Sequence, residues 1–209
     1  MPDAIADSGR IASLDALEAI YGAASGRAIT KEIDHISDAY RAFVEASPFM
    51  VLSTVGPEGT DSSPRGDPAG FCRVVDAKTV LIPDRRGNNR IDSLRNIVRD
   101  PRCSLLFLVP TVAETLRING HAELRVDPDL LASFAFEGKL PRSVIKVTAE
   151  RVYFQCSKAF ARSRLWDHAG WPTERPVPTA GQILKGIEAD FDATAYDAGY
   201  PEHLRNTIY

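Results

Sequence analysis

Between residues 49 and 156 the sequence is a series of short β-prone segments at even spacing, and this pattern constrains the fold more than any other feature. Apolar and β-branched residues dominate each segment, and turn signals such as Gly56-Pro57-Glu58-Gly59 separate them. The predicted strands span residues 49–55, 60–64, 70–75, 79–83, 103–109, 114–126 and 143–156. Because few helices fall between them, the pattern predicts an antiparallel barrel of six or seven strands and not a parallel βαβ sheet.

Helices are predicted mainly at the two ends of the chain. Ser13 can cap a first helix, and a second is expected from Ser37 to Ala46, just before Pro48. Three more are expected over residues 89–99, 127–134 and 182–191. The predicted domains are a helical appendage at 1–46, the barrel at 47–168 and a loop and helix extension at 169–209, packed on the barrel or on a partner.

Composition limits the partners and the compartment. The 209 residues carry 25 basic and 28 acidic side chains, a net charge of −3, which makes a general nucleic-acid-binding role a poor fit. The longest apolar run, residues 105–110, is too short to span a bilayer, and the first ten residues lack an apolar signal core. We therefore expect a cytoplasmic protein with neither a nucleic-acid nor a membrane partner.

The cysteines and histidines do not form a recognisable metal or disulfide pattern. Cys72, Cys103 and Cys156 are odd in number and far apart, so buried free thiols in a reducing compartment are expected. None of the four histidines has an i,i+4 partner or a carboxylate at ligand spacing. No metal site is therefore predicted, and no catalytic residue is assigned.

One loop has the composition of an anion-binding site. A strand is expected to end at Pro83, and the next residues contain Arg85, Arg86 and Arg90 among glycine and asparagines before a helix. Helix N-termini attract anions, and arginine suits phosphate because it donates two parallel hydrogen bonds. Asn88 or Asn89 is expected to cap the helix. The alternative is a solvated turn with surface arginines.

A second basic residue precedes this loop in the sequence. Arg65 follows the hairpin in the run Ser62-Ser63-Pro64-Arg65-Gly66-Asp67. In a barrel, the end of that strand can lie beside the arginine-containing loop, so that two segments converge on one anion. The alternative for Arg65 alone is a surface charge beside a turn.

Several motifs occur in an order that is informative. Residues 79–107 read TVLIPDRRGNNRIDSLRNIVRDPRCSLLF, residues 117–123 read RINGHAE, and residues 154–166 read FQCSKAFARSRLW. This order, over about residues 45–168, resembles the flavin-binding core of the pyridoxamine 5'-phosphate oxidase-like split barrels, and the last motif is similar to a subgroup of FMN-dependent enzymes. The resemblance implies a mainly β fold with peripheral helices, an antiparallel six-stranded split β-barrel, and a homodimer with FMN at the subunit interface.

The resemblance also implies which residues contact the cofactor. Arg65, Gly66 and Asp67 would line the isoalloxazine and reach the phosphate, while Ile82, Pro83 and Asp84 would offer backbone groups to the ring. The phosphate would be held by Arg86, Gly87, Asn88, Asn89 and Arg90, although which of them makes the main ion pair is left open. Thr115 falls where a flavin-contacting glutamine is found in the family. The partner chain would supply Ser157, Lys158, Arg162 and Trp166, for which the alternative is an amphipathic helix with a solvated basic side.

The implied function is that of an FMN-dependent oxidoreductase that transfers two electrons through flavin N5 to an unidentified small molecule, with NAD(P)H as a candidate donor. The substrate-phosphate features of true pyridoxamine phosphate oxidases are not recognisable, so we expect a different substrate. Two alternatives remain: a flavin- or haem-binding carrier or sensor without turnover, and a deazaflavin-dependent reductase. The loop arginines favour a phosphate-bearing flavin over haem, which needs an axial ligand.

Overall fold

The computed structural model describes residues 9–24 and 26–209, and the chain divides into two compact units, Met1–Glu32 and Ile33–Tyr209. The first unit contains α1 (Leu14–Tyr21) and α2 (Gly26–Thr30). The Ser13 hydroxyl accepts a hydrogen bond from the Ala16 N–H at 3.2 Å, which confirms the predicted cap. No residue of α1 is buried.

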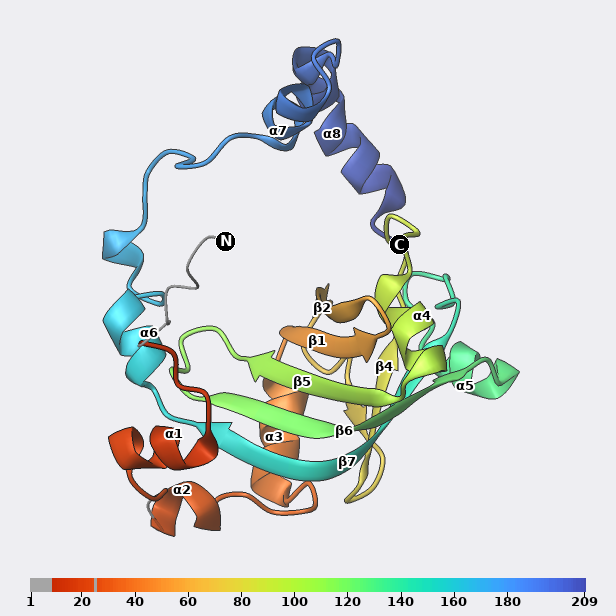
Figure 1. The fold of residues 1–209 in the computed structure, drawn as a ribbon. Helices are drawn as coiled ribbons and strands as arrows, with labels where there is room; N and C mark the ends of the chain where they lie inside the picture. Colours follow the sequence, from red (N-terminus) through yellow and green to blue (C-terminus); the bar gives the residue numbers. More distant parts are fainter. Residues whose placement is uncertain (1–8, 25) are drawn as a thin grey trace, which may run out of the picture. The chain divides into compact units, whose positions relative to one another are not determined.

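The second unit is built on one antiparallel sheet, shown in Figure 1. Its strands are β1 (Phe49–Gly56), β2 (Gly59–Gly66), β3 (Arg73–Val74), β4 (Thr79–Pro83), β5 (Arg102–Leu108), β6 (Thr115–Arg125) and β7 (Val144–Gln155). They lie in the order β2-β1-β5-β6-β7-β4-β3, and every neighbouring pair is antiparallel. The predicted mainly β, antiparallel fold is confirmed. The sheet has seven strands and not the six that the resemblance implied, because the two-residue β3 extends it beyond β4. The predicted barrel is not closed, since among the described residues β2 and β3 are the two edges of the sheet and do not pair with each other.

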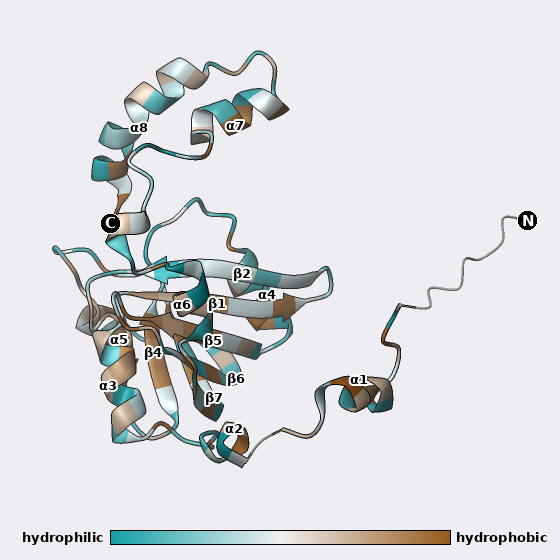
Figure 2. Cartoon of the chain, turned by 90° about the vertical axis from the view of Figure 1, so that its left-hand side faces the viewer, coloured by the Kyte–Doolittle hydropathy of each residue, from teal (hydrophilic) through white to brown (hydrophobic). Residues whose placement is uncertain are grey.

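The core lies on one face of the central strands, where alternate side chains point inward. On β1, β5 and β6 the residues at every second position are fully buried: Met50, Leu52, Leu105, Phe107, Leu116 and Ile118. Strand β4 is buried along its whole length, and Figure 2 shows it mostly brown, whereas β2 is pale to teal. Burial of such side chains stabilises the fold by roughly 1.5–3 kcal/mol each, so the hydrophobic strands hold the sheet together and β2 is left as a polar edge.

Helix α3 (Asp38–Ala46) packs on this core, within the second compact unit. The helix was predicted from Ser37 to Ala46, and Ser37 is its N-cap, accepting from the Tyr40 N–H. Val44 is fully buried, and Tyr40 and Phe43 pack against the core cluster. The apolar side of the helix therefore faces the core, as the amphipathic spacing of these residues requires.

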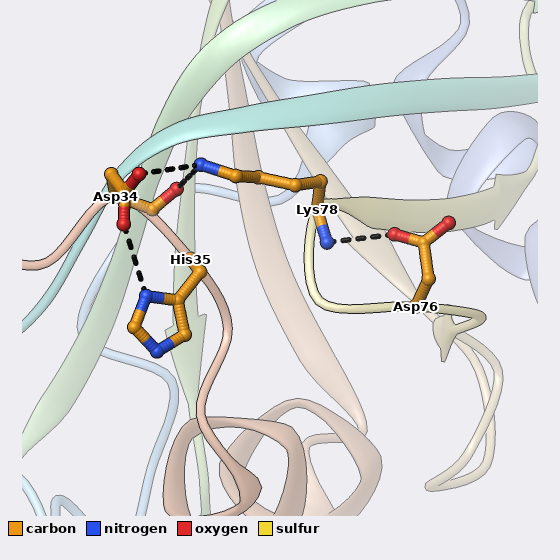
Figure 3. Close-up of polar contacts among 4 residues, drawn as sticks. All are labelled: Asp34, His35, Asp76 and Lys78. Carbon is orange, nitrogen blue, oxygen red and sulfur yellow. Dashed lines mark hydrogen bonds and ion pairs between the residues drawn. The ribbon is translucent and has the colours of Figure 1, made fainter.

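Hydrogen bonds and ion pairs tie the segment before α3 to the turn between β3 and β4 (Figure 3). The Lys78 ammonium donates to the main-chain oxygen of Asp34 and, at 3.0 Å, to its carboxylate. His35 Nδ1 lies 3.0 Å from the other carboxylate oxygen. The bonds from His35 and then from Lys78 lower the pKa of Asp34 to about 2, so this exposed carboxylate is ionised at neutral pH.

The remaining helices are α4 (Asp92–Arg99), α5 (Pro128–Ser133), α6 (Lys158–Ser163), the short 3₁₀ helix η1 (His168–Gly170), α7 (Ala180–Ile187) and α8 (Ala193–Thr207). Helix α8 was not predicted, and it pairs with α7 through Asp197, which accepts from the Gly181 N–H at 2.9 Å. Within the described part of the chain, no helix has both the length and the apolar character that crossing a bilayer would need.

The prediction for α4 was wrong at its start. The helix begins at Asp92 and not at Asn89, because Asn89 and Ile91 have left-handed backbone angles, with φ of 61° and 54°. The N-cap position is occupied by Ile91, whose side chain cannot accept a hydrogen bond, so neither Asn88 nor Asn89 caps the helix.

The three cysteines differ in burial. Cys72 and Cys103 lie in the core, where burial raises the pKa of the Cys103 thiol to about 12 and that of Cys72 well above its usual value. Cys156 is exposed, so the expectation of a buried thiol was wrong there. It directly follows the last residue of β7, where the chain leaves the sheet.

Candidate functional site

A cavity of about 780 Å³ lies where β2 ends and the chain passes from β4 to α4. This volume is within the range typical of small-molecule sites. Nine of the residues predicted to contact a cofactor line it: Arg65, Gly66, Pro83, Asp84, Arg86, Gly87, Asn88, Asn89 and Arg90. The structure therefore brings the end of β2 and residues 84–91, here called the arginine loop, to a single cavity.

The other predicted contacts do not line this cavity: Asp67, Ile82, Thr115, Ser157, Lys158, Arg162 and Trp166. Ile82 is fully buried in the core, where β4 pairs with β7. Thr115 lies at the start of β6, within 3.5 Å of Gln155.

Helix α6, which carries Lys158 and Arg162, lies at the far end of β7 from the cavity. Pro83, in the cavity wall, pairs with Val144 at the beginning of β7, whereas α6 follows the last residue of that strand. A strand of this length extends about 36 Å. Just after α6, Trp166 donates from its indole N–H to the main-chain oxygen of Val112 at 2.8 Å. These residues are therefore remote from the cavity of their own chain, and Figure 1 shows α6 and α4 on opposite sides of the sheet.

Two ion pairs join the end of β2 to the segment after β4. Arg65 Nη1 lies 2.6 Å from the Asp84 carboxylate, and Arg85 Nε lies 2.7 Å from that of Asp67. All four side chains are mostly buried, and Asp67 is only 2% exposed. Strand β2 is an edge strand that pairs only with β1 among the described residues. Side-chain charges, and not a strand pairing, therefore connect the end of β2 to the segment after β4.

Arg65 retains unused hydrogen-bonding capacity. Its Nε is buried and has no hydrogen-bond partner among the residues that the structure describes. An unsatisfied buried donor is costly and is uncommon in folded proteins. Because Arg65 lines the cavity, this donor is one observation that favours a polar ligand there.

The ion pair of Arg85 and Asp67 is enclosed by aromatic rings from later in the chain. The Arg85 guanidinium lies 5.7 Å from the ring of Phe136 and 5.9 Å from that of Tyr209. The Tyr209 hydroxyl donates to Asp67 at 2.6 Å, and this hydrogen bond is the main reason why the pKa of Tyr209 rises to about 12. The wall behind the arginine loop is therefore closed by the end of the C-terminal extension.

The arginine loop itself has an unusual backbone. Ile91 is β-branched and yet left-handed, a conformation that costs roughly 1–2 kcal/mol. Asn88 stabilises the loop locally, because its side-chain oxygen accepts from the Arg90 N–H at 3.1 Å. With no side chain capping α4, the N–H groups of its first turn are not used by a cap and contribute to a positive potential.

Further cavity residues were missed by the sequence analysis. Arg142 and Ser143, just before β7, line the cavity, as do Asp61 on β2 and Ser93 on α4, which are joined by a 2.7 Å hydrogen bond. The Asp84 N–H donates to the Ser143 main-chain oxygen at 2.9 Å, which brings Arg142 to the cavity. No sequence motif marks these residues, since their position depends on the pairing of β4 with β7.

Comparison with solved structures finds similar chains at low sequence identity. HupZ of Group A Streptococcus is 16% identical with a TM-score of 0.46, and the match covers 56% of this chain and 91% of that one. A conserved hypothetical protein of Mycobacterium tuberculosis is 18% identical with a TM-score of 0.45, covering 70% and 95%. An F420 reductase is 16% identical with a TM-score of 0.41, covering 57% and 98%. No curated protein matches the chain.

Comparison with protein families gives a match that spans more than half of the chain. The family described as pyridoxamine 5'-phosphate oxidase matches residues 36–156. These residues include α3, all seven strands and the arginine loop. The chain therefore belongs to the pyridoxamine 5'-phosphate oxidase family.

Proposed function

We propose that this protein is an FMN-dependent oxidoreductase that works as a homodimer with FMN in the cavity beside the arginine loop. The observation that carries the proposal is the convergence of five arginines from three segments on one cavity: Arg65, Arg85, Arg86, Arg90 and Arg142. Such a cluster suits a doubly charged phosphate ester, because guanidinium groups bind phosphate oxygens in pairs.

The same cavity also offers apolar surface for a flat ring. Pro64, Phe71, Pro83 and Leu94 are among its lining residues. A phosphate-bearing flavin needs both kinds of surface, because its phosphate is charged and its isoalloxazine is largely apolar. The donor set and the volume therefore fit FMN, with the arginine loop binding the phosphate and the β2 end contacting the ring.

A haem-binding carrier fits this cavity less well. Haem iron takes an axial ligand from His, Cys, Met or Tyr, and none of the described lining residues is of these types. A deazaflavin-dependent reductase differs from the FMN proposal only in the cofactor, so the choice between them depends on a binding measurement.

A second copy of the chain would complete the site. Ser157, Lys158, Arg162 and Trp166 do not line the cavity of their own chain, so they contribute to a cofactor site only if a partner supplies them. Lys158 and Arg162 would then add positive charge, and Trp166 an aromatic surface.

When bound, FMN would supply two-electron transfer at its N5 atom, with NAD(P)H as the proposed donor and a small molecule as the acceptor. The chain's own contribution is to bind and orient. The arginine loop fixes the phosphate remote from the reacting ring, and this binding energy restricts the position of the ring. None of the cavity residues is assigned as an acid or a base.

The test is a titration of the purified protein with FMN, riboflavin and a deazaflavin, followed by flavin fluorescence, together with light scattering for the oligomeric state. We expect a yellow dimer that binds FMN more tightly than riboflavin and whose bound flavin is reduced by NADH or NADPH. Arg86→Ala should weaken FMN binding, whereas Arg99→Ala, which removes an exposed arginine paired with Glu58 outside the cavity, should not. A colourless monomer that is indifferent to FMN would refute the proposal.

A further inference from the structure

The charges around the cavity are not equivalent, because most of the arginines are already paired with carboxylates. Arg65 is paired with Asp84, Arg85 with Asp67, and Arg90 with Asp92 at 2.8 Å. A paired guanidinium has part of its charge neutralised and part of its donor set used. These three arginines are therefore weaker candidates for the main phosphate ion pair than their number suggests.

Two arginines in the cavity wall have no such partner. Among the described residues, neither Arg86 nor Arg142 is within ion-pair distance of a carboxylate. Arg86 is on the arginine loop, and Arg142 comes from the connection before β7. Both residues are exposed and line the cavity, so their guanidinium N–H groups are available to a ligand.

The position of Arg142 is fixed from two sides. Its Nη1 donates to the side-chain oxygen of Asn89 at 3.2 Å, which ties the guanidinium to the arginine loop. The next residue, Ser143, is held by the hydrogen bond from the Asp84 N–H. Asn89 is itself left-handed, a conformation that asparagine tolerates better than most residues, so the loop presents its amide toward Arg142.

We propose that Arg142 is a phosphate-binding residue of this cavity and that it acts with Arg86 as the main pair of cations for the FMN phosphate. Two unpaired guanidinium groups match the two negative charges of a phosphate monoester, whereas Arg65 and Arg85 hold the wall together through their buried carboxylate partners. This assignment rests on the proposed function, and it adds a binding residue from a segment that the family motifs of this sequence do not include.

The experiment compares Arg142→Ala, Arg142→Lys and Arg99→Ala with the unmodified chain. Dissociation constants for FMN and for riboflavin are measured by flavin fluorescence, because only FMN carries the phosphate. Losing one charge-assisted contact should weaken FMN binding by about 10- to 100-fold, with little change for riboflavin. Arg142→Lys should be intermediate, since lysine keeps the charge but not the paired donors. Arg99→Ala should behave like the unmodified chain.

A second measurement separates this proposal from the proposed function. Inorganic phosphate should raise the unfolding temperature of the unmodified chain and have a smaller effect on Arg142→Ala. If the unmodified chain binds FMN but Arg142→Ala keeps the same FMN to riboflavin ratio, the role of Arg142 is refuted and the flavin proposal stands. If FMN does not bind but phosphate stabilises the chain through Arg142, the anion site stands and the flavin assignment fails. Loss of FMN and riboflavin binding alike in a folded Arg142→Ala variant would contradict a phosphate-specific role.

Discussion

Replacing Asp84 by Asn tests whether an ion pair closes the cavity wall. Asp84 and Arg65 are 2.6 Å apart, with side chains 13% and 18% exposed, so the pair is mostly shielded from water. Removing one partner of a buried pair typically costs 3–5 kcal/mol, because the other charge stays buried without compensation. Asn keeps one acceptor oxygen, and water reaches part of both groups, so we expect a loss of about 2–3 kcal/mol.

The measurement is unfolding by heat and by urea. For a chain of this size, the expected loss corresponds to a drop in unfolding temperature of roughly 4–12 °C. Asp92→Asn is a matched control, because Asp92 pairs with Arg90 on the surface, where the arginine side chain is 75% exposed. That control should cost less than about 1 kcal/mol. If Asp84→Asn is no more destabilising than Asp92→Asn, the pair does not hold the wall and the reasoning fails.

The same substitution should have the opposite effect on ligand affinity. Asn has no charge, so Arg65 is left with its full positive charge in the cavity wall. Removing a negative charge from the cavity wall should favour anion binding by about 0.5–2 kcal/mol, or roughly 2- to 30-fold. We therefore expect Asp84→Asn to lower stability and to tighten FMN binding, and a parallel loss of both would contradict the assignment of Arg65 to the cavity surface.

Three further predictions concern other parts of the chain. Gly120→Ala should cost at least about 3 kcal/mol in urea unfolding, because its Cβ would lie 1.9 Å from the Thr148 main-chain oxygen, whereas Gly199→Ala, with open space around it, should be neutral or slightly stabilising. The pKa of Tyr209 is raised from 10.0 to about 12, so the stabilisation from its hydrogen bond to Asp67 should be complete below pH 10 and should disappear as the pH rises toward about 12. Tyrosinate absorbance should report the raised pKa, and the free energy of unfolding should fall over this pH range; Tyr209→Phe should abolish that part of the pH dependence. A thiol reagent should label Cys156 rapidly in the native protein and reach Cys72 and Cys103 only on unfolding; fast labelling of three thiols would contradict the burial of the two core cysteines.

Local patterns were sufficient to predict most of the strands and the helix that packs on them. Strand β4 was predicted with its observed bounds, and α3 within one residue of its start and with its observed end at Ala46. These elements have a clear period or a capping residue, so neighbouring residues determine them. The helix at Asp92–Arg99 was placed too early because asparagine is both a good cap and a residue that adopts left-handed angles, and sequence alone does not decide between the two.

The cavity was only partly predictable for a different reason. The arginine loop and Arg65 were recognised because each lies in a motif of its own segment. Arg142 was missed, since it reaches the cavity only through the pairing of β4 with β7 and the hydrogen bond between Asp84 and Ser143. The ion pairs that commit Arg65 and Arg85 to carboxylates were also invisible, because their partners lie 19 and 18 residues away in the sequence.

The arrangement of charges explains how one cavity can be both stable and attractive to an anion. Had all five arginines been unpaired, their mutual repulsion would have opposed folding, since like charges in a partly buried wall are poorly screened. Pairing Arg65 and Arg85 with Asp84 and Asp67 turns that repulsion into the contact that joins the end of β2 to the arginine loop. Arg86 and Arg142 can then remain unpaired at the surface of a wall that no longer depends on them. It follows that substitutions at Arg65 and Arg85 should mainly lower the free energy of unfolding, whereas substitutions at Arg86 and Arg142 should mainly weaken the affinity for the anion.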